Sequence, residues 1–258
     1  MSGISVSHFV FAAALAGVAA CSGPKAEPAA NKTVSGADAP VAAINADAPA
    51  NPVAAALPAA ETADGKERFY GKERFTLVMT HSGSQTGTTT THVRDWGRLR
   101  AEINDHSLSV AGMVQPTRNR IVFEGARATT IDAASNAATA LDNPFYDQVV
   151  AAMRGRTGVE FGEQIMAQLG GRATGEKGSF AGEPCDYWEI AAVGSRSCVT
   201  PWGATLHLKT SFGGITLEQT ATDLRVGDGG PDTAFAFDAA SVTEAPDLTD
   251  LMSKLNRN

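Results

Sequence analysis

The sequence predicts an α+β domain, mainly β, built on a strongly curved antiparallel sheet. Beyond residue 70, short runs of alternating apolar and polar residues follow one another and are separated by glycine-rich turns. Two helical patterns interrupt these runs in mid-chain, and a third ends the chain. Because closely spaced strands joined by short turns form a meander, we expect an antiparallel sheet covered by two mid-chain helices and a C-terminal helix.

The strands are predicted from a side-chain period of two. In the first of them Phe75, Leu77 and Met79 alternate with smaller or polar residues, which is typical of a half-buried strand. A Gly-Ser-Gln turn leads to a threonine-rich strand over 87–94, whose β-branched side chains suit a pleated surface. The other strands are predicted over 98–104, 120–124, 128–132, 172–177, 184–192, 197–202, 205–211, 215–224 and 233–238.

The two mid-chain helices have recognisable start signals. Asn143 is a cap followed by proline at the first helical position, and Gly155 ends this helix. Thr157 and Glu160 have the spacing of a capping box, and the helix that they open runs to Gly170. We interpret the apolar stripes of all three helices as contacts with the sheet. The C-terminal stripe follows Asp247 and consists of Leu248, Leu251, Met252 and Leu255.

The first residues have the pattern of an export signal. The uncharged stretch over 9–20 is too short to span a bilayer but long enough for a signal peptide. Its ending, Val-Ala-Ala before Cys21, resembles the lipobox of bacterial lipoproteins. That resemblance implies a signal peptide over 1–20 and acyl chains such as palmitate on Cys21, with Ser22 favouring the outer membrane. The alternative is an ordinary cleaved signal peptide with an incidental cysteine.

Residues 21–64 predict a disordered tether, and residues 65–258 the globular domain. The tether is rich in alanine and proline and has no apolar period of 3.6 or 2. Such a segment cannot bury enough apolar surface to offset the entropy lost on ordering. We therefore expect a domain that faces the periplasm on a lipid-anchored stalk.

Lipid on Cys21 leaves two of the three cysteines, Cys185 and Cys198. They flank a predicted hairpin, and disulfides persist in an oxidising compartment such as the periplasm. A metal site is the rival interpretation, but no second cysteine or histidine lies nearby at ligand spacing. The cysteine pattern therefore predicts a disulfide.

Composition and motifs argue against several function classes. The net charge of -7, without a basic stripe, argues against nucleic-acid binding. The cluster of Arg94, Arg98 and Arg100 alternates in part with apolar residues and is interpreted as a solvated strand face. No zinc-helix, nucleophile-elbow or phosphate-loop motif occurs, so we expect a non-enzyme without cofactor or bound metal. His81 and His92 would make a weak metal or proton site if they faced each other across the first hairpin.

The order of sheet, mid-chain helices and further sheet resembles the periplasmic lipoprotein carrier and receptor fold of the LolA and LolB type. A related set of small envelope proteins of unknown function is similar over 75–80, 97–102, 182–185 and 199–202. The resemblance spans residues 70–245, and this chain departs from it in having Cys198 and no tryptophan-rich N-terminal stretch. It implies an open half-barrel whose concave face holds an acyl chain.

A hydrophobic ligand, either a lipid or a lipoprotein acyl chain, is therefore expected on the concave face. An equally weighted interpretation is that the same side chains pack a dry core. In that case the chain is a structural or protein-binding envelope module with a closed core. The candidate lining residues are Phe75, Leu77, Met79, Trp96, Phe123, Phe145, Trp188 and Trp202.

Overall fold

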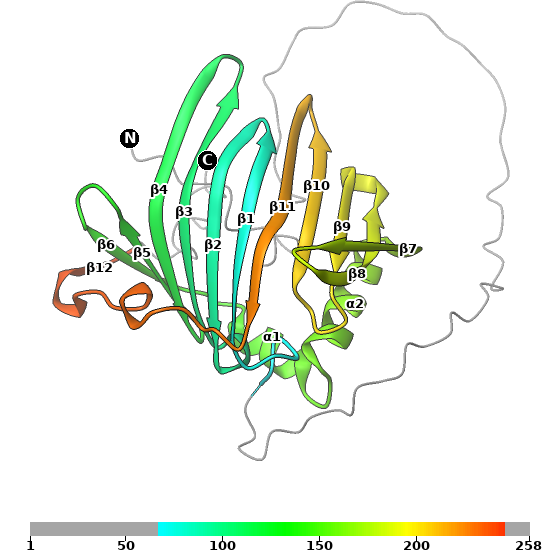
Figure 1. Ribbon diagram of the computed structural model, residues 1–258. Coiled ribbons are helices and arrows are strands. Elements are labelled where there is room, and N and C mark those ends of the chain that lie inside the picture. Colours follow the sequence, from blue (N-terminus) through cyan, green and yellow to red (C-terminus); the bar gives the residue numbers. More distant parts are fainter. Residues whose placement is uncertain (1–66, 246–258) are drawn as a thin grey trace, which may run out of the picture. The chain divides into compact units, whose positions relative to one another are not determined.

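The computed structural model describes residues 67–245, and within them the chain is mainly β. Twelve strands form one sheet in the order β12-β6-β5-β4-β3-β2-β1-β11-β10-β9-β8-β7 (Figure 1). Since β12 and β7 stand at opposite ends of this order, the sheet is not closed. The predicted signal peptide, the predicted tether with Cys21 and the predicted C-terminal helix fall outside the described residues.

Twelve strands and two α-helices make up this part of the chain. Before the helices the strands are β1 (Phe75–Gly83), β2 (Gln85–Arg94), β3 (Leu99–Val110), β4 (Met113–Glu124), β5 (Arg127–Asp132) and β6 (Ala138–Asp142). The helices are α1 (Tyr146–Met153) and α2 (Gly158–Gln168). After them come β7 (Gly171–Phe180), β8 (Glu183–Ile190), β9 (Ser195–Val199), β10 (Thr205–Phe212), β11 (Ile215–Val226) and β12 (Val242–Glu244).

Two meanders make up the sheet and join in its middle. Strands β1 to β6 pair in chain order, and so do β7 to β11, all antiparallel. The two series meet where β1 pairs with β11, with Phe75 opposite Val226. The predicted meander is thus confirmed, except at one edge, where β12 pairs parallel with β6.

The alternation of β1 defines two faces of the sheet, here called the Phe75 face and the Thr76 face. Phe75, Leu77 and Met79 point to the first face, and their neighbours to the second. Phe75 is 1% exposed and Thr76 is 0% exposed, so both faces are buried where β1 begins. The sheet is therefore covered on both sides at this end.

Each face has its own apolar cluster. The first cluster gathers Phe75, Leu77 and Met79 with Trp202 and Leu206. The second lies over β3 to β6 on the Thr76 face. There the 227–241 segment packs Ala234, Phe235 and Phe237 against the strands.

The predicted strand over 233–238 is wrong, because this stretch belongs to the 227–241 segment. Residues Asp232–Ala234 form a 3-10 turn, and a second turn covers Ala239–Ser241. The Arg120 guanidinium donates to the Thr233 carbonyl oxygen at 2.5 Å and to the Ala236 carbonyl oxygen at 2.6 Å. These two carbonyl oxygens therefore bond to a side chain in place of a neighbouring strand.

Some strands were missed or predicted too short. The sequence pattern predicts neither β6 nor β12, and it predicts that β4 begins only at residue 120. The start of β4 contains Pro116, which lacks an amide hydrogen and is unusual inside a strand. The three-residue β12 depends on its pairing with β6, since Val242 lies opposite Ala138. Such pairing between distant segments leaves no local signal.

The helices connect β6 to β7 and cover the sheet less than predicted. Figure 1 shows both at the end of the sheet where β1 begins. The capping box is confirmed: the Thr157 amide donates to Glu160 Oε2 at 2.7 Å, and the Glu160 amide donates to Thr157 Oγ1 at 3.2 Å. In α1 only Met153 is buried, and in α2 no residue is. Neither helix of the described chain has the length and apolarity to cross a membrane.

Candidate ligand-binding face

Four of the predicted lining residues come together on the Phe75 face. Phe75, Leu77, Met79 and Trp202 belong to the first apolar cluster and are 1–7% exposed. The Phe75 and Trp202 rings meet edge to face, with centroids 5.0 Å apart, and Tyr70 makes a similar contact with Phe75 at 5.1 Å. These side chains therefore pack against one another.

The other four predicted lining residues lie outside this cluster. Trp96 is in the turn after β2, with the Arg68 guanidinium 4.2 Å from its ring. Phe145 precedes α1 and is 50% exposed. Trp188 is half-buried on β8, opposite Ser197. Phe123 is on the Phe75 face but contacts a charged group, the Arg100 guanidinium 4.1 Å from its ring.

Arg100 corrects the prediction of a solvated strand face. Because Arg100 lies opposite Phe123 on β4 and Val93 on β2, it points to the Phe75 face and is partly buried there. Its Nε lies 3.1 Å from Glu102 Oε1. Burial alone would lower the pKa of Arg100, but Glu102 and Tyr70 outweigh it and raise the pKa above its ordinary value. The alternation of charged and apolar residues in the sequence does not show that a charged side chain is partly buried when it forms an ion pair, as Arg100 does with Glu102.

Beyond Met79 the Phe75 face becomes polar, and a chain of hydrogen bonds crosses four strands. His81 Nε2 is 2.8 Å from Thr89 Oγ1, and Thr89 donates to Asn104 Oδ1 at 2.9 Å. Asn104 Nδ2 then donates to Asn119 Oδ1 at 3.0 Å. We call these four residues the polar chain. It runs from β1 to β4.

The ring of His81 stacks on that of His106 above a glycine. In the register, Gly87 of β2 stands between His81 of β1 and His106 of β3. The ring centroids are 5.1 Å apart, with an interplanar angle of 28°. A Cβ at position 87, where φ is +122°, would lie 2.3 Å from the Asp105 carbonyl oxygen and 2.5 Å from His106 Cα. Only glycine fits under this stack.

Burial lowers the pKa of His81 below its ordinary value, and the neighbouring Gln85 side chain opposes the shift in part. A buried imidazole loses hydration that its charged form needs more than its neutral form does. The neutral ring is therefore the form that this end of the face favours.

The predicted pairing of His81 with His92 is wrong. His92 lies opposite Thr76, at the other end of the hairpin and on the other face. Its Nδ1 is 2.9 Å from Thr76 Oγ1, and that hydroxyl donates to the Asp228 carbonyl oxygen at 3.0 Å. Within residues 67–245, no three histidine, cysteine or acidic side chains lie close enough to hold a metal ion.

The predicted disulfide is confirmed between Cys185 of β8 and Cys198 of β9. Their Cα atoms are 5.3 Å apart. Gly178 of β7 lies over the bridge, because a Cβ there would be 2.8 Å from Cys198 Sγ. With both cysteines at most 1% exposed, the bridge is a buried part of the fold.

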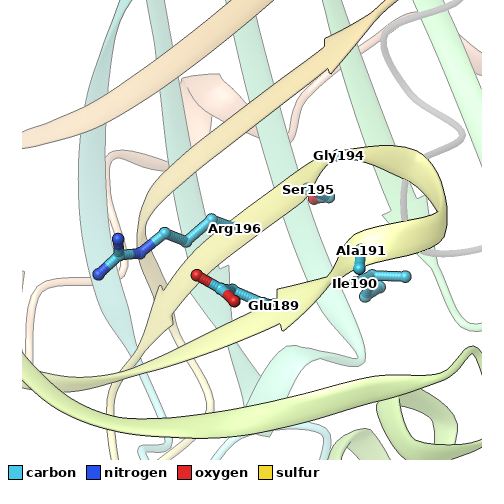
Figure 2. Close-up of a pocket in the computed structure, with 6 residues that line it drawn as sticks. All are labelled: Glu189, Ile190, Ala191, Gly194, Ser195 and Arg196. Atoms are coloured by element: carbon cyan, nitrogen blue, oxygen red, sulfur yellow. The ribbon is translucent and has the colours of Figure 1, made fainter.

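A shallow surface hollow of about 210 Å³ lies on the β8–β9 hairpin (Figure 2). Its lining combines the charged Glu189 and Arg196 with Ile190 and small turn residues. None of the predicted lining residues contributes to it. This hollow is therefore not the apolar concave face that is predicted from the sequence.

Comparisons with known proteins give weak similarity. No protein-family model and no curated protein matches the sequence. Among solved structures, an uncharacterized conserved protein from Thermus thermophilus is 8% identical, with a TM-score of 0.43 over 68% of this chain and 92% of that chain. LprF from Mycobacterium bovis is 7% identical, with a TM-score of 0.32 over 62% of this chain and 87% of its own. PNGF-II is 10% identical, with a TM-score of 0.31 over 70% of this chain and 32% of its own. TM-scores this low do not establish a common fold.

Proposed function

We propose that this chain is a non-enzymatic lipoprotein of the bacterial outer membrane that binds a hydrophobic ligand, a lipid or an acyl chain. In this proposal the domain faces the periplasm, and the Phe75 face is the concave side of an open half-barrel. The observation that carries the proposal is an unclosed sheet with a separate apolar cluster on each face. Over β3 to β6 the 227–241 segment packs on the Thr76 face, and the Phe75 face, on which Leu77 and Ile121 are buried, is the side proposed to take the guest.

Along β1 the side chains of the Phe75 face change from apolar to polar, which suits an amphiphile. Leu77 of the first apolar cluster stands at one end of a row across the strands, followed by Thr91, Glu102 and Ile121. The next row begins with Met79 and contains Thr89, Asn104 and Asn119 of the polar chain, and His81 begins the row after it. An acyl chain would contact Leu77, Met79 and Ile121 and bring its head group to the polar chain. Burying apolar surface is favourable by about 25 cal/mol per Å².

Native mass spectrometry of the protein purified from the envelope without added detergent tests the proposal. We expect lipid adducts on the wild-type protein and their loss in Ile121→Glu, because a carboxylate would be desolvated by an acyl chain. Ile103→Glu is the matched control, since Ile103 lies on the Thr76 face of β3 and is 39% exposed. Repeated adduct-free spectra of the wild-type protein would contradict ligand binding.

One observation favours a second function, that of a protein-binding envelope module. Phe75, Leu77, Met79 and Trp202 fill the space between them with their own side chains, as a closed core would. In that case the domain carries no lipid, and crosslinking in intact cells yields a defined protein partner. Adduct-free spectra together with such a crosslink would select this function.

A further inference from the structure

Two hairpin tips of the sheet expose apolar side chains to solvent. Among the described residues, the three most exposed large apolar side chains are Phe212 at 75%, Met113 at 73% and Val114 at 66%. Met113 and Val114 follow the turn between β3 and β4, and Phe212 precedes the turn between β10 and β11. Single exposed apolar side chains are common on protein surfaces, but a concentration of them at one end of a fold marks a contact surface.

The two tips extend beyond the shorter hairpin that lies between them. In the sheet, β1 and β2 separate β3 and β4 from β11 and β10. The Ser84 amide in the β1–β2 turn donates to the Thr216 carbonyl oxygen, and the Ser109 amide donates to the Ser84 carbonyl oxygen, both at 2.7 Å. This turn is therefore level with Ser109 and Thr216. Residues 110–113 and 212–215 lie past that level, and we call them the two prongs (Figure 1).

Both prongs have the same construction. Each consists of one apolar cross-strand pair, Val110 with Met113 or Phe212 with Ile215, joined by a two-residue turn. The φ angles of the turn residues are positive in both prongs, 51° and 80° at 111–112 and 59° and 80° at 213–214. Two positive φ angles are typical of the type I′ turn, which matches the twist of a hairpin. The prongs are therefore regular hairpin ends that hold their apolar side chains at the end of the sheet.

This end of the sheet also lacks charged residues. Aspartate, glutamate, lysine and arginine make up 19% of the chain, but none of them occurs in 75–93, 106–117 or 210–217, which contain the three hairpin turns. At about 3.4 Å per residue, roughly 13 Å of strand separates the turn of either prong from the nearest charge on its own strands. Elements that lie in a membrane interface enter it by roughly 5–10 Å. The prongs therefore fit that depth without desolvating a charged side chain.

We propose that the two prongs insert their apolar side chains into the interface of a lipid bilayer. A bilayer needs no matching shape, so both prongs enter it although a shorter hairpin lies between them. The net charge of -7 gives no attraction to anionic head groups, so the contact is apolar. Because few side chains enter, the contact is weak and reversible, and it orients a domain that the predicted lipid on Cys21 retains at the membrane. This inference goes beyond the proposed function, because it requires no bound ligand.

The test is an equilibrium titration of the mature chain from Ser22 onward, which lacks both the predicted signal peptide and the lipid. The environment-sensitive dye NBD is attached at Ser109→Cys, an exposed position beside the first prong. Phosphatidylcholine vesicles should raise its fluorescence to saturation, equally at low and at high salt, because salt screens charges and not apolar contacts. Phe212→Ser, in the other prong, should require about tenfold more lipid for half-saturation, as the loss of one large apolar side chain predicts.

Phe145→Ser is the matched control and should leave the titration unchanged. It makes the same chemical change at a half-exposed residue that precedes α1, at the opposite end of the sheet (Figure 1). The inference is wrong if vesicles do not raise the fluorescence of the labelled parent, or if both substitutions weaken binding equally. It is also wrong if the chain is a dimer that Phe212→Ser dissociates, because the prongs then contact a second copy. Lipid adducts test the proposed function separately, so either proposal can fail without the other.

Discussion

At the scale of single residues, Gly87 allows the imidazole of His81 to stack on that of His106, because a Cβ there would overlap backbone atoms of β3. The alternation in the sequence predicted that Phe75, Leu77 and Met79 share one buried face, and they do. The polar chain escaped prediction because its members come from four strands, and only the register shows that His81 and Asn119 belong together. A threonine-rich run with one glycine gives no sign that two imidazoles stack above that glycine.

Gly87→Ala is expected to destabilise the domain by about 3 kcal/mol, because the new Cβ would overlap backbone atoms of β3 at a positive φ. Urea unfolding followed by circular dichroism measures the change. The matched control is Gly162→Ala in α2, where a Cβ meets nothing within 4 Å. That substitution should raise stability by about 0.5–1 kcal/mol, since alanine favours helix more than glycine does. Equal stability of the two variants would contradict the close packing at Gly87.

Acid is expected to weaken the fold through the histidines. Burial lowers the pKa of His81, and burial is also the main cause of the lowered pKa of His92. The unfolded chain, with an ordinary imidazole pKa of about 6.5, then binds more protons than the native state. Stability is therefore highest above that pH and falls as the pH drops through it toward the native pKa.

The melting temperature of the wild-type chain should accordingly be lower at about pH 5 than at about pH 7. His81→Gln removes one titrating ring and should shrink this difference, whatever its effect on stability at neutral pH. Thermal melts of both proteins at the two pH values provide the comparison. A wild-type protein that melts higher in acid would contradict the burial of neutral imidazoles.

At the scale of elements, two local signals were reliable and long-range pairings were not. The capping box at Thr157 and the bridge from Cys185 to Cys198 follow from short patterns, and both are present. The predicted cap at Asn143 is wrong, because α1 begins at Tyr146 with Phe145 as its N-cap and no side-chain cap bond. The strand expected over 233–238 failed because Arg120, more than 100 residues earlier, binds two of its carbonyl groups. The edge strand β12 was missed for a similar reason, since it exists only against β6.

Replacing both bridge cysteines by alanine, in a Cys21→Ser background, should lower the free energy of unfolding by about 3 kcal/mol. This is the value that loop-closure entropy gives for a short loop, here with cysteines 13 residues apart. Urea unfolding compares the double variant with the Cys21→Ser parent, which keeps the bridge as its only cysteine pair. An unchanged midpoint and slope would show that β8 and β9 are held in register without the bridge.

At the scale of the whole molecule, location and fold are predicted by different parts of the chain. The lipobox and the tether predict the location of the protein, and the strand patterns beyond residue 70 predict the fold of its globular domain. The mainly β, unclosed sheet agrees with the expectation drawn from sequence. The apolar stripes of the helices predicted that the helices cover the sheet. The stripe of α2 is only half-buried at Phe161 and Ile165, so this helix covers the sheet less than its pattern predicted.

Cys21→Ser is expected to release the protein from the membrane, because the acyl chains that would anchor it are attached to that thiol. Fractionation of cells that express either form, followed by immunodetection, should find the wild-type protein with outer-membrane vesicles and the variant elsewhere. Ser22→Ala is the control, since it leaves the thiol in place and introduces no aspartate. Membrane association of Cys21→Ser would contradict lipid anchoring.

The junction of β1 with β11 has a consequence for how this protein is made. Each meander assembles from neighbours in the chain, but the strands at their junction are separated by most of the domain. If the chain is exported as its lipobox predicts, β1 emerges well before the strand that completes its hydrogen bonding. Contacts between such distant segments form slowly, because a long loop must close first. Until then an edge with Phe75 and Leu77 beside it stays open to other chains, so the nascent domain should depend on a periplasmic chaperone to avoid aggregation.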